Sequence, residues 1–141
     1  MSISIFSRTI KVSTQGFCDV VDITDKVQNI VNDSKIKTGM VVVFVAGSTA
    51  GIATIEANAG LEQDLKEALE IIAPVNKKYH HDDKWGDGNG FSHIRASLIG
   101  PSINVPVINS ESTLGAWQQI VLCDFDNKTR RREVLVQVLG E

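Results

Sequence analysis

Residues 40–46 read MVVVFVA, a continuous apolar run that is rich in β-branched side chains. Such a run predicts a β-strand buried on both faces of a sheet, because a strand with one wet face alternates apolar and polar residues. The small-residue loop GSTAG follows at residues 47–51, and residues 52–57 predict the next strand. We therefore place residues 40–46 at the centre of a sheet and extend the prediction outward from them.

Several further segments have strand-type composition. They are rich in β-branched and apolar residues and cover residues 3–5, 9–12, 17–23, 102–108, 115–125 and 130–139. Turn signals such as Thr14-Gln15-Gly16 and Asp126-Asn127 separate neighbouring segments.

Three helices interrupt these strands. Residues 25–35 and 61–72 carry apolar residues at helical spacing, and Pro74 ends the second of these helices. Asn89 and Gly100 are suited to cap a third helix between them. Because strands dominate and strict strand–helix–strand alternation is missing, we predict an α+β fold with a largely antiparallel, sandwich-like or barrel-like sheet core.

Size and composition restrict the class of protein. The chain has 141 residues, which suits one domain spanning residues 1–141, and its net charge of −3 gives no reason to expect a nucleic-acid partner. No apolar run reaches the ~20 residues that span a bilayer, and the N-terminal segment lacks the pattern of a signal peptide. Cys18 and Cys123 form no metal or disulfide motif, so we expect buried thiols in a cytoplasmic protein.

A glycine-rich loop is the strongest local signal for a binding site. Residues 86–90 read GDGNG and lead directly into the third predicted helix. Backbone N–H groups of Gly88, Asn89 and Gly90 could bind a phosphate at the positive end of that helix. The spacing matches neither a Walker loop nor a dinucleotide-binding fingerprint. A flexible turn followed by a helix cap explains the same residues equally well.

The three histidines are His80, His81 and His93. In an extended segment the first two would point to opposite sides, so only one of them would share a site with His93. Two imidazoles and a carboxylate can bind a divalent cation, although ordinary surface or core histidines fit the spacing as well. The candidate carboxylates are Asp82, Asp83, Asp87 and Glu56.

Other polar residues have both a functional and a structural interpretation. The hydroxyl groups of Ser48 and Thr49 could hold phosphate, or they could belong to a tight turn. Arg95 could neutralise an anion or lie on a solvated helix face, and residues 130–132 are expected to form surface ion pairs. Trp85 and Trp117 could line a pocket or pack in the core.

Four blocks give the chain a resemblance to a known family. They are GSTAGIATIEAN, YHHDDKWGDGNGFSHIRASLIGPSINVPV, LGAWQQIVLCDFD and RRREVLVQVLGE, and they lie within residues 47–141. In content and order they resemble the YjbQ-like family, whose members are described as secondary thiamine-phosphate synthases or remain uncharacterised. The resemblance implies an α+β homotrimer with a histidine-containing site near the GDGN loop that sometimes holds a metal.

The chain departs from the family pattern at two positions. Gly47 stands where the family commonly has the histidine of a His-Thr-Thr-Ala segment, and Phe91 replaces the first histidine of a His-x-His pair. His81 and His93 are retained. Positions 91 and 93 are about 200° apart on an ideal helix, so only one of them is expected to face a site.

The resemblance implies a thiamine-phosphate synthase-like transferase that acts on small phosphorylated substrates. We assign general acid/base or metal-binding roles to His81 and His93, with Zn²⁺ or Mg²⁺ as the cation, and an orienting role to Asp87. Phosphate binding is assigned to Ser48, Thr49, Gly88, Asn89 and Gly90. The alternative is a non-catalytic ligand-binding or structural homotrimer that has lost part of the family's histidine site.

Overall fold

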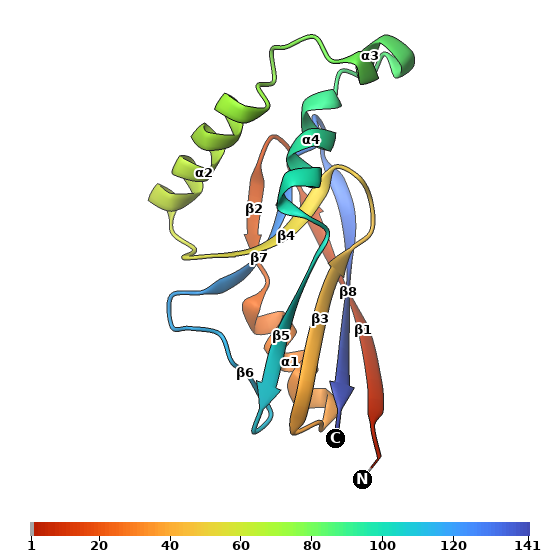
Figure 1. Ribbon diagram of the computed structural model, residues 1–141, viewed down its shortest axis with the longest axis vertical. Coiled ribbons are helices and arrows are strands. Elements are labelled where there is room, and N and C mark those ends of the chain that lie inside the picture. Colours follow the sequence, from red (N-terminus) through yellow and green to blue (C-terminus); the bar gives the residue numbers. More distant parts are fainter. Residues whose placement is uncertain (1) are drawn as a thin grey trace.

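Two antiparallel sheets form a half-barrel in the computed structural model, which describes residues 2–141 (Figure 1). The larger sheet has the order β1-β8-β3-β5-β6, with β1 at Ser4–Thr14, β8 at Arg130–Gly140, β3 at Thr38–Val45, β5 at Ser102–Ile108 and β6 at Glu111–Ser112. The smaller sheet has the order β2-β7-β4, with β2 at Asp19–Asp22, β7 at Gln119–Asp124 and β4 at Ala50–Ile55. All strand pairs are antiparallel, so the predicted α+β class is confirmed.

Four helices complete the described residues, where the sequence predicts three. They are α1 at Thr24–Ser34, α2 at Ala59–Ile72, α3 at His80–Trp85 and α4 at Gly90–Ile99. The additional helix α3 is short and lies in a segment whose polar composition predicts irregular structure. It has no buried residue, so no apolar periodicity marks it in the sequence.

Two predicted strands are shorter than expected. Residues 115–125 predict a strand, but β7 covers only Gln119–Asp124, because the Gln118 amide donates to the Gly115 carbonyl oxygen in a turn. Residues 17–23 predict a strand, but β2 begins only at Asp19. Phe17 and Cys18 have left-handed backbone conformations, with φ of 52° and 71°, which a strand cannot accommodate. Their N–H groups instead donate hydrogen bonds to the carbonyl oxygens of Asp126 and Asp124.

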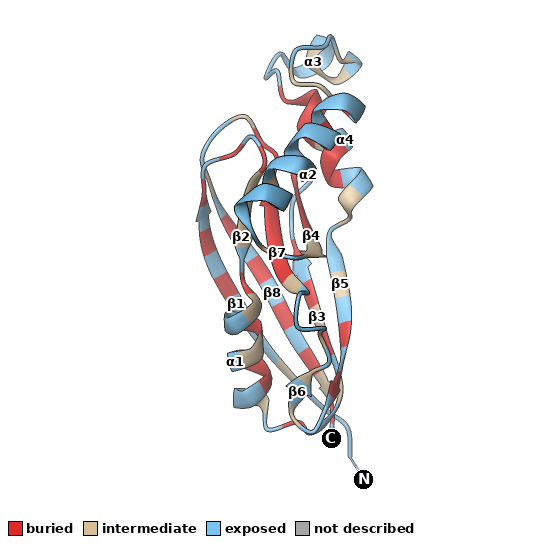
Figure 2. Ribbon diagram, turned by 90° about the vertical axis from the view of Figure 1, so that its left-hand side faces the viewer, coloured by how far each residue is buried: buried red, intermediate tan, exposed pale blue. Residues whose placement is uncertain are grey.

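The main core lies between the concave faces of the two sheets. Alternate residues of β1, β3 and β8 are buried there, as the banded strands in Figure 2 show. In β3 this holds for Val41, Val43 and Val45, whereas Met40 and Phe44 on the other face are exposed. The central position of β3 is therefore as predicted, but its expected burial on both faces is wrong within this chain.

A second, smaller core covers the opposite face of β7. Leu69 of α2 and Ala96 of α4 pack there with Val121, Cys123 and Phe125. Cys18 belongs to the same cluster, and both cysteines are free and buried as expected. Burial, and secondarily the neighbouring Cys18, raises the pKa of the Cys123 thiol to about 12, so this thiol is unreactive.

The helices α3 and α4 lie at one end of the half-barrel, opposite the two chain termini (Figure 1). The β3–β4 connection reaches the same end, and the residues after β7 meet it there. Within residues 2–141, no helix combines the length and apolar character needed to cross a bilayer.

Candidate functional site

A cleft of about 380 Å³ opens at this end of the molecule. The β3–β4 connection, α3, the loop before α4, α4 itself and the start of β8 all contribute to it. Its lining residues are Gly47, Ser48, Thr49, His81, Trp85, Asp87, Asn89, His93, Arg130 and Arg132. The structure thus brings His81, His93, Asp87, Ser48, Thr49 and Asn89 together, as predicted.

A buried ion pair forms the floor of the cleft. Arg132 donates from Nε and Nη2 to the two carboxylate oxygens of Asp124, at 2.7 and 2.9 Å. Asp124 is fully buried and also accepts a hydrogen bond from the Thr14 hydroxyl. Arg132 Nη2 donates at 2.7 Å to Thr49 Oγ1 as well. Such a bidentate pair fixes the plane of the guanidinium group.

A second arginine–aspartate pair lies beside the first. Arg130 places Nε 2.8 Å and Nη2 2.7 Å from Asp126 Oδ2, and Asp126 is fully buried. Burial alone would raise the pKa of Asp126, but hydrogen bonds from the Asn89 side chain, the Asn127 amide and Arg130 outweigh it and lower that pKa. Asp126 therefore stays ionised and holds Arg130 at the mouth of the cleft.

Part of each guanidinium group is accessible from the cleft. Arg132 Nη1 is the terminal nitrogen that faces Gly47, where an added Cβ would lie only 3.2 Å from it. Gly47 has a φ of +121°, a conformation that essentially only glycine adopts. The Arg130 side chain is 39% exposed, so its outer edge is accessible. Two fixed positive groups therefore face one cavity.

The two imidazoles that line the cleft lie against each other. The ring centroids of His81 and His93 are 4.3 Å apart. His81 Nδ1 is 3.2 Å from Asp82 Oδ1 and 3.5 Å from Asp87 Oδ1. Burial and the neighbouring His81 lower the pKa of His93, so its ring is neutral near pH 7 and can accept a proton.

The neighbouring His80 does not take part. The extended geometry expected for residues 80 and 81 is wrong, because both belong to α3, but they still diverge: His80 is exposed and does not line the cleft.

The donor set around His81 suits a divalent cation. His81, Asp82 and Asp87 each present one ligand atom within 4.8 Å of the other two. One imidazole and two carboxylates suit Zn²⁺ or Mn²⁺, and the carboxylates alone suit Mg²⁺. Asp82 and Asp87 are both among the carboxylates that the sequence offers as ligands, whereas His93, also expected as a ligand, contributes through its ring contact with His81 rather than as a member of this set.

The glycine-rich loop is built differently from the predicted phosphate cradle. The Gly90 amide, expected to bind phosphate, donates at 2.9 Å to Asp82 Oδ1. Gly88 is exposed and does not line the cleft. Asn89 occupies the N-cap of α4 without capping it, and its Nδ2 instead donates to Asp126 Oδ1 at 3.2 Å. Of residues 88–90, it is therefore the Asn89 side chain that lines the cleft, and not a row of free backbone amides.

Positions 91 and 93 face opposite directions, as helical geometry requires. The ring of Phe91 is fully buried and stacks on Phe17 with ring centroids 6.0 Å apart. Arg95, from the next turn, lies over the same ring and binds Glu70 and the Ala73 carbonyl, so it has a packing role. Position 93 is the one that faces the cleft, and the residue present there is a histidine.

The two arginine–aspartate pairs were not predicted from the sequence. Arg130 and Arg132 were expected in surface ion pairs, but Arg132 is buried and both line the cleft. The sequence contains a signal for their orientation, because side chains two residues apart in a strand lie on the same face. Arg130 and Arg132 therefore lie on the same face of β8 as the buried Val134, Val136 and Val138. Of the weaker candidates, Glu56 is exposed outside the cleft, Trp85 lines it, and Trp117 does not.

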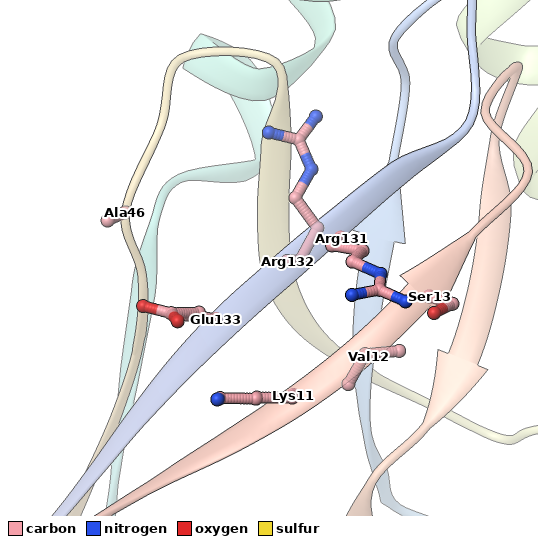
Figure 3. Close-up of a pocket in the computed structure, with 7 residues that line it drawn as sticks. All are labelled: Lys11, Val12, Ser13, Ala46, Arg131, Arg132 and Glu133. Atoms are coloured by element: carbon pink, nitrogen blue, oxygen red, sulfur yellow. The ribbon is translucent and has the colours of Figure 1, made fainter.

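A second cavity, of about 540 Å³, lies beside Arg131 and Glu133 (Figure 3). Its other lining residues are Lys11, Val12, Ser13, Ala46 and Arg132, although the Arg132 side chain extends away from Lys11, Ser13 and Glu133. Lys11, Arg131 and Glu133 are exposed.

Comparison with known proteins agrees with this architecture. The family described as UPF0047 protein YjbQ-like matches residues 8–141. A UPF0047 protein of Archaeoglobus fulgidus is 36% identical over 121 residues, covering 86% of this chain and 91% of its own. One from Methanothermobacter thermautotrophicus is 34% identical, covering 97% and 94%.

Solved structures of the same group share the fold. A YbjQ-like protein of unknown function from Sulfolobus solfataricus superimposes with a TM-score of 0.94 at 33% identity, covering 99% of this chain and 100% of its own. A hypothetical protein from Aeropyrum pernix gives a TM-score of 0.88 at 30% identity, covering 96% and 98%. The chain is an α+β half-barrel protein with a polar cleft at one end. It belongs to the YjbQ/UPF0047 family.

Proposed function

We propose that the cleft binds a small phosphorylated molecule and that the imidazole pair acts on it. The observation that carries this proposal is the pair of arginines whose guanidinium groups are held by buried carboxylates and open toward the same cleft. Arginine matches the geometry of phosphate oxygens, and a preorganised guanidinium loses little entropy when it binds one. Ser48, which is exposed beside them, supplies a hydroxyl donor.

The reaction that we propose is a thiamine-phosphate synthase-like transfer. A bond forms between the ring nitrogen of a thiazole phosphate and the methylene carbon of a pyrimidine diphosphate, while the bond from that carbon to oxygen breaks and pyrophosphate leaves. Arg130 and Arg132 neutralise the leaving phosphates. The thiazole nitrogen carries no proton, so the step releases none; the neutral His93 ring and His81, which Asp87 orients, position the two reactants in the cleft.

A divalent cation fits this proposal. His81, Asp82 and Asp87 would hold it, with His93 beside them. When bound, Zn²⁺ or Mg²⁺ supplies positive charge to a diphosphate. The carboxylates of Asp82 and Asp87 would otherwise repel that group, so they place the cation rather than the phosphate.

We further propose that copies of this chain assemble as a trimer in the cytoplasm. The outer face of the larger sheet carries the exposed side chains of Ile5, Met40, Phe44 and Leu135 and the half-buried Leu139. In adjacent strands Phe44 pairs with Leu135, and Leu139 pairs with Met40 and Ile5. Such an apolar row is a surface that a second copy can cover. Sedimentation should show a trimer that Phe44→Lys dissociates, and a monomeric wild type would refute the assembly.

A second candidate is a ligand-binding protein without turnover. Gly47 leaves the cleft floor without a side chain, and Phe91 is part of the core, so two imidazoles rather than a larger cluster face the ligand. This variant of the proposal keeps phosphate binding but predicts no product.

Calorimetric titration separates these functions. Thiazole phosphate, pyrimidine diphosphate and inorganic phosphate are titrated with and without Zn²⁺ or Mg²⁺, and product is assayed in parallel. Binding that Arg130→Gln weakens, together with turnover lost in His93→Ala and His81→Ala, supports the transferase. Binding without turnover supports the second candidate. No binding of any of the three compounds would refute both.

A further inference from the structure

Trp85 is the one large aromatic side chain among the residues that line the cleft. It is the last residue of α3, and its side chain is 65% exposed, so packing does not explain it. Exposed indoles are unfavourable in water, and those on cleft walls commonly contact ligands.

The position of Trp85 relative to the cleft is fixed from both sides. Gly86 forms the C-cap of α3, and its amide donates at 2.8 Å to the Asp82 carbonyl oxygen. The next residue, Asp87, accepts a hydrogen bond at 2.8 Å on its carbonyl oxygen from Asn127 Nδ2. Because Asn127 immediately follows Asp126, this contact ties the end of α3 to the segment that holds Arg130.

One face of the indole is already covered. Lys84 Nζ lies 5.0 Å from the ring centroid of Trp85, in a cation–π contact. The contact leaves the other face of the ring for a ligand. A flat ring with delocalised electrons is the group that stacks best on an indole.

A second observation also indicates an absent ligand. Asn89 is 5% exposed and lines the cleft, and its Oδ1 is buried with no hydrogen-bond partner among residues 2–141. A buried acceptor without a donor is rare in folded proteins and costs free energy. A ligand that carries an N–H or O–H group near its phosphate would satisfy it.

We propose that Trp85 determines specificity by stacking on a planar aromatic ring of the phosphorylated ligand, with Arg130 and Arg132 holding its phosphate. This inference rests on the proposed function and adds a residue to it. The cleft would then prefer aromatic phosphate monoesters to aliphatic ones of equal size, because stacking on an indole contributes about a tenfold gain in affinity.

Three probes test the stacking role by calorimetry: phenyl phosphate, cyclohexyl phosphate and inorganic phosphate. The variants are Trp85→Leu, Trp85→Phe and, as a matched control, Trp117→Leu, which removes the other tryptophan, also exposed but outside the cleft. We expect wild type to bind phenyl phosphate about tenfold more tightly than cyclohexyl phosphate. Trp85→Leu should abolish that preference, Trp85→Phe should keep part of it, and Trp117→Leu should leave it unchanged.

The outcomes distinguish the two proposals. Inorganic phosphate binding with equal affinities for the phenyl and cyclohexyl esters would overturn the stacking role and leave the phosphate site standing. Loss of affinity for all three probes in Trp85→Leu would also overturn it, since a stacking subsite for an aromatic ring does not contact inorganic phosphate. If wild type binds no probe, the proposed function fails and the stacking role fails with it.

Discussion

Two cavities border the first residues of β8, and the arginine side chains that line them are held in different ways. Arg130 and Arg132 enter the cleft, each paired with a buried aspartate, whereas Arg131 and Glu133 border the outer cavity and are exposed. Arg132 also lines the outer cavity, but its guanidinium group is bound to Asp124 and Thr49 on the cleft side. The outer cavity is the larger, at about 540 Å³ against 380 Å³.

The comparison shows that preorganisation, rather than size, distinguishes a binding site. In the cleft, hydrogen bonds that Arg132 donates to Asp124 and Arg130 donates to Asp126 fix both guanidinium planes before a ligand arrives. Around the outer cavity, Lys11 lies opposite Glu133 in the strand register, and both side chains are exposed, so such a pair contributes little to positioning a charge. An anion therefore gains more from the smaller cavity.

The largest expected effect comes from removing the buried partner of Arg132. Asp124→Ala leaves a buried guanidinium group unpaired and should lower the free energy of unfolding by about 3–5 kcal/mol. Glu133→Ala, next to the outer cavity, should change it by less than about 0.5 kcal/mol. Urea denaturation measures both, and similar losses in the two variants would contradict the distinction.

Phosphate affinity should separate neighbouring arginines. Arg130→Gln removes a charged hydrogen bond worth about 1.5–3 kcal/mol, so inorganic phosphate should bind about 10- to 100-fold more weakly. Arg131→Gln carries the same change in charge on the opposite face of the strand and should bind as wild type does. Equal weakening in both variants would show that net charge, and not the cleft, attracts the anion.

A pair of glycines tests whether the space in front of Arg132 matters. Gly47→Ala and Gly100→Ala both force alanine into positive φ, at 121° and 90°, and should each destabilise the fold by about 1–2 kcal/mol. Only the new methyl group at position 47 meets another side chain, Arg132 Nη1 at 3.2 Å. Phosphate affinity should therefore fall in Gly47→Ala alone; unchanged affinity there would place the anion elsewhere.

The smallest effect concerns pH. The pKa of His93 lies below the ordinary value of about 6.5 that the unfolded chain has. As the pH falls below 6.5, the unfolded chain takes up this proton first, so the free energy of unfolding should decrease until the lowered pKa is reached. Above pH 7 the group contributes no pH dependence. Unfolding of wild type and His93→Gln from pH 5 to 8 measures this, and a steeper slope in the variant would contradict it.

The sequence predicted the parts of the molecule that depend on apolar periodicity. The strand at residues 40–46, the antiparallel α+β class and the helices before Pro74 and Gly100 follow from local patterns that the core confirms. The helix α3 could not be predicted in this way, because none of its residues is buried. The exposure of Met40 and Phe44 was also not predicted, because amino-acid composition does not indicate which face of a sheet is covered by other elements of the same chain.

The candidate site was predicted only in part. The pairing of His81 with His93 followed from the resemblance and from helical geometry at position 93. The role of Asp82 in holding the Gly90 amide could not be foreseen, because that contact joins two elements whose relative placement is tertiary. The orientation of Arg132 was predictable in principle, because it lies on the same face of β8 as the buried valines. A charged residue on a buried face requires a partner, however, and no local pattern identifies Asp124 as that partner.

The most direct test of the anion site is a titration of the uniformly labelled protein with inorganic phosphate, followed by nuclear magnetic resonance of backbone amides and arginine Nε–H groups. We predict that shifts concentrate at Ser48, His93 and the Nε–H groups of Arg130 and Arg132, while Lys11 and Arg131 stay unchanged. Shifts centred on Lys11 and Arg131, or no saturable shift in the cleft, would contradict the account.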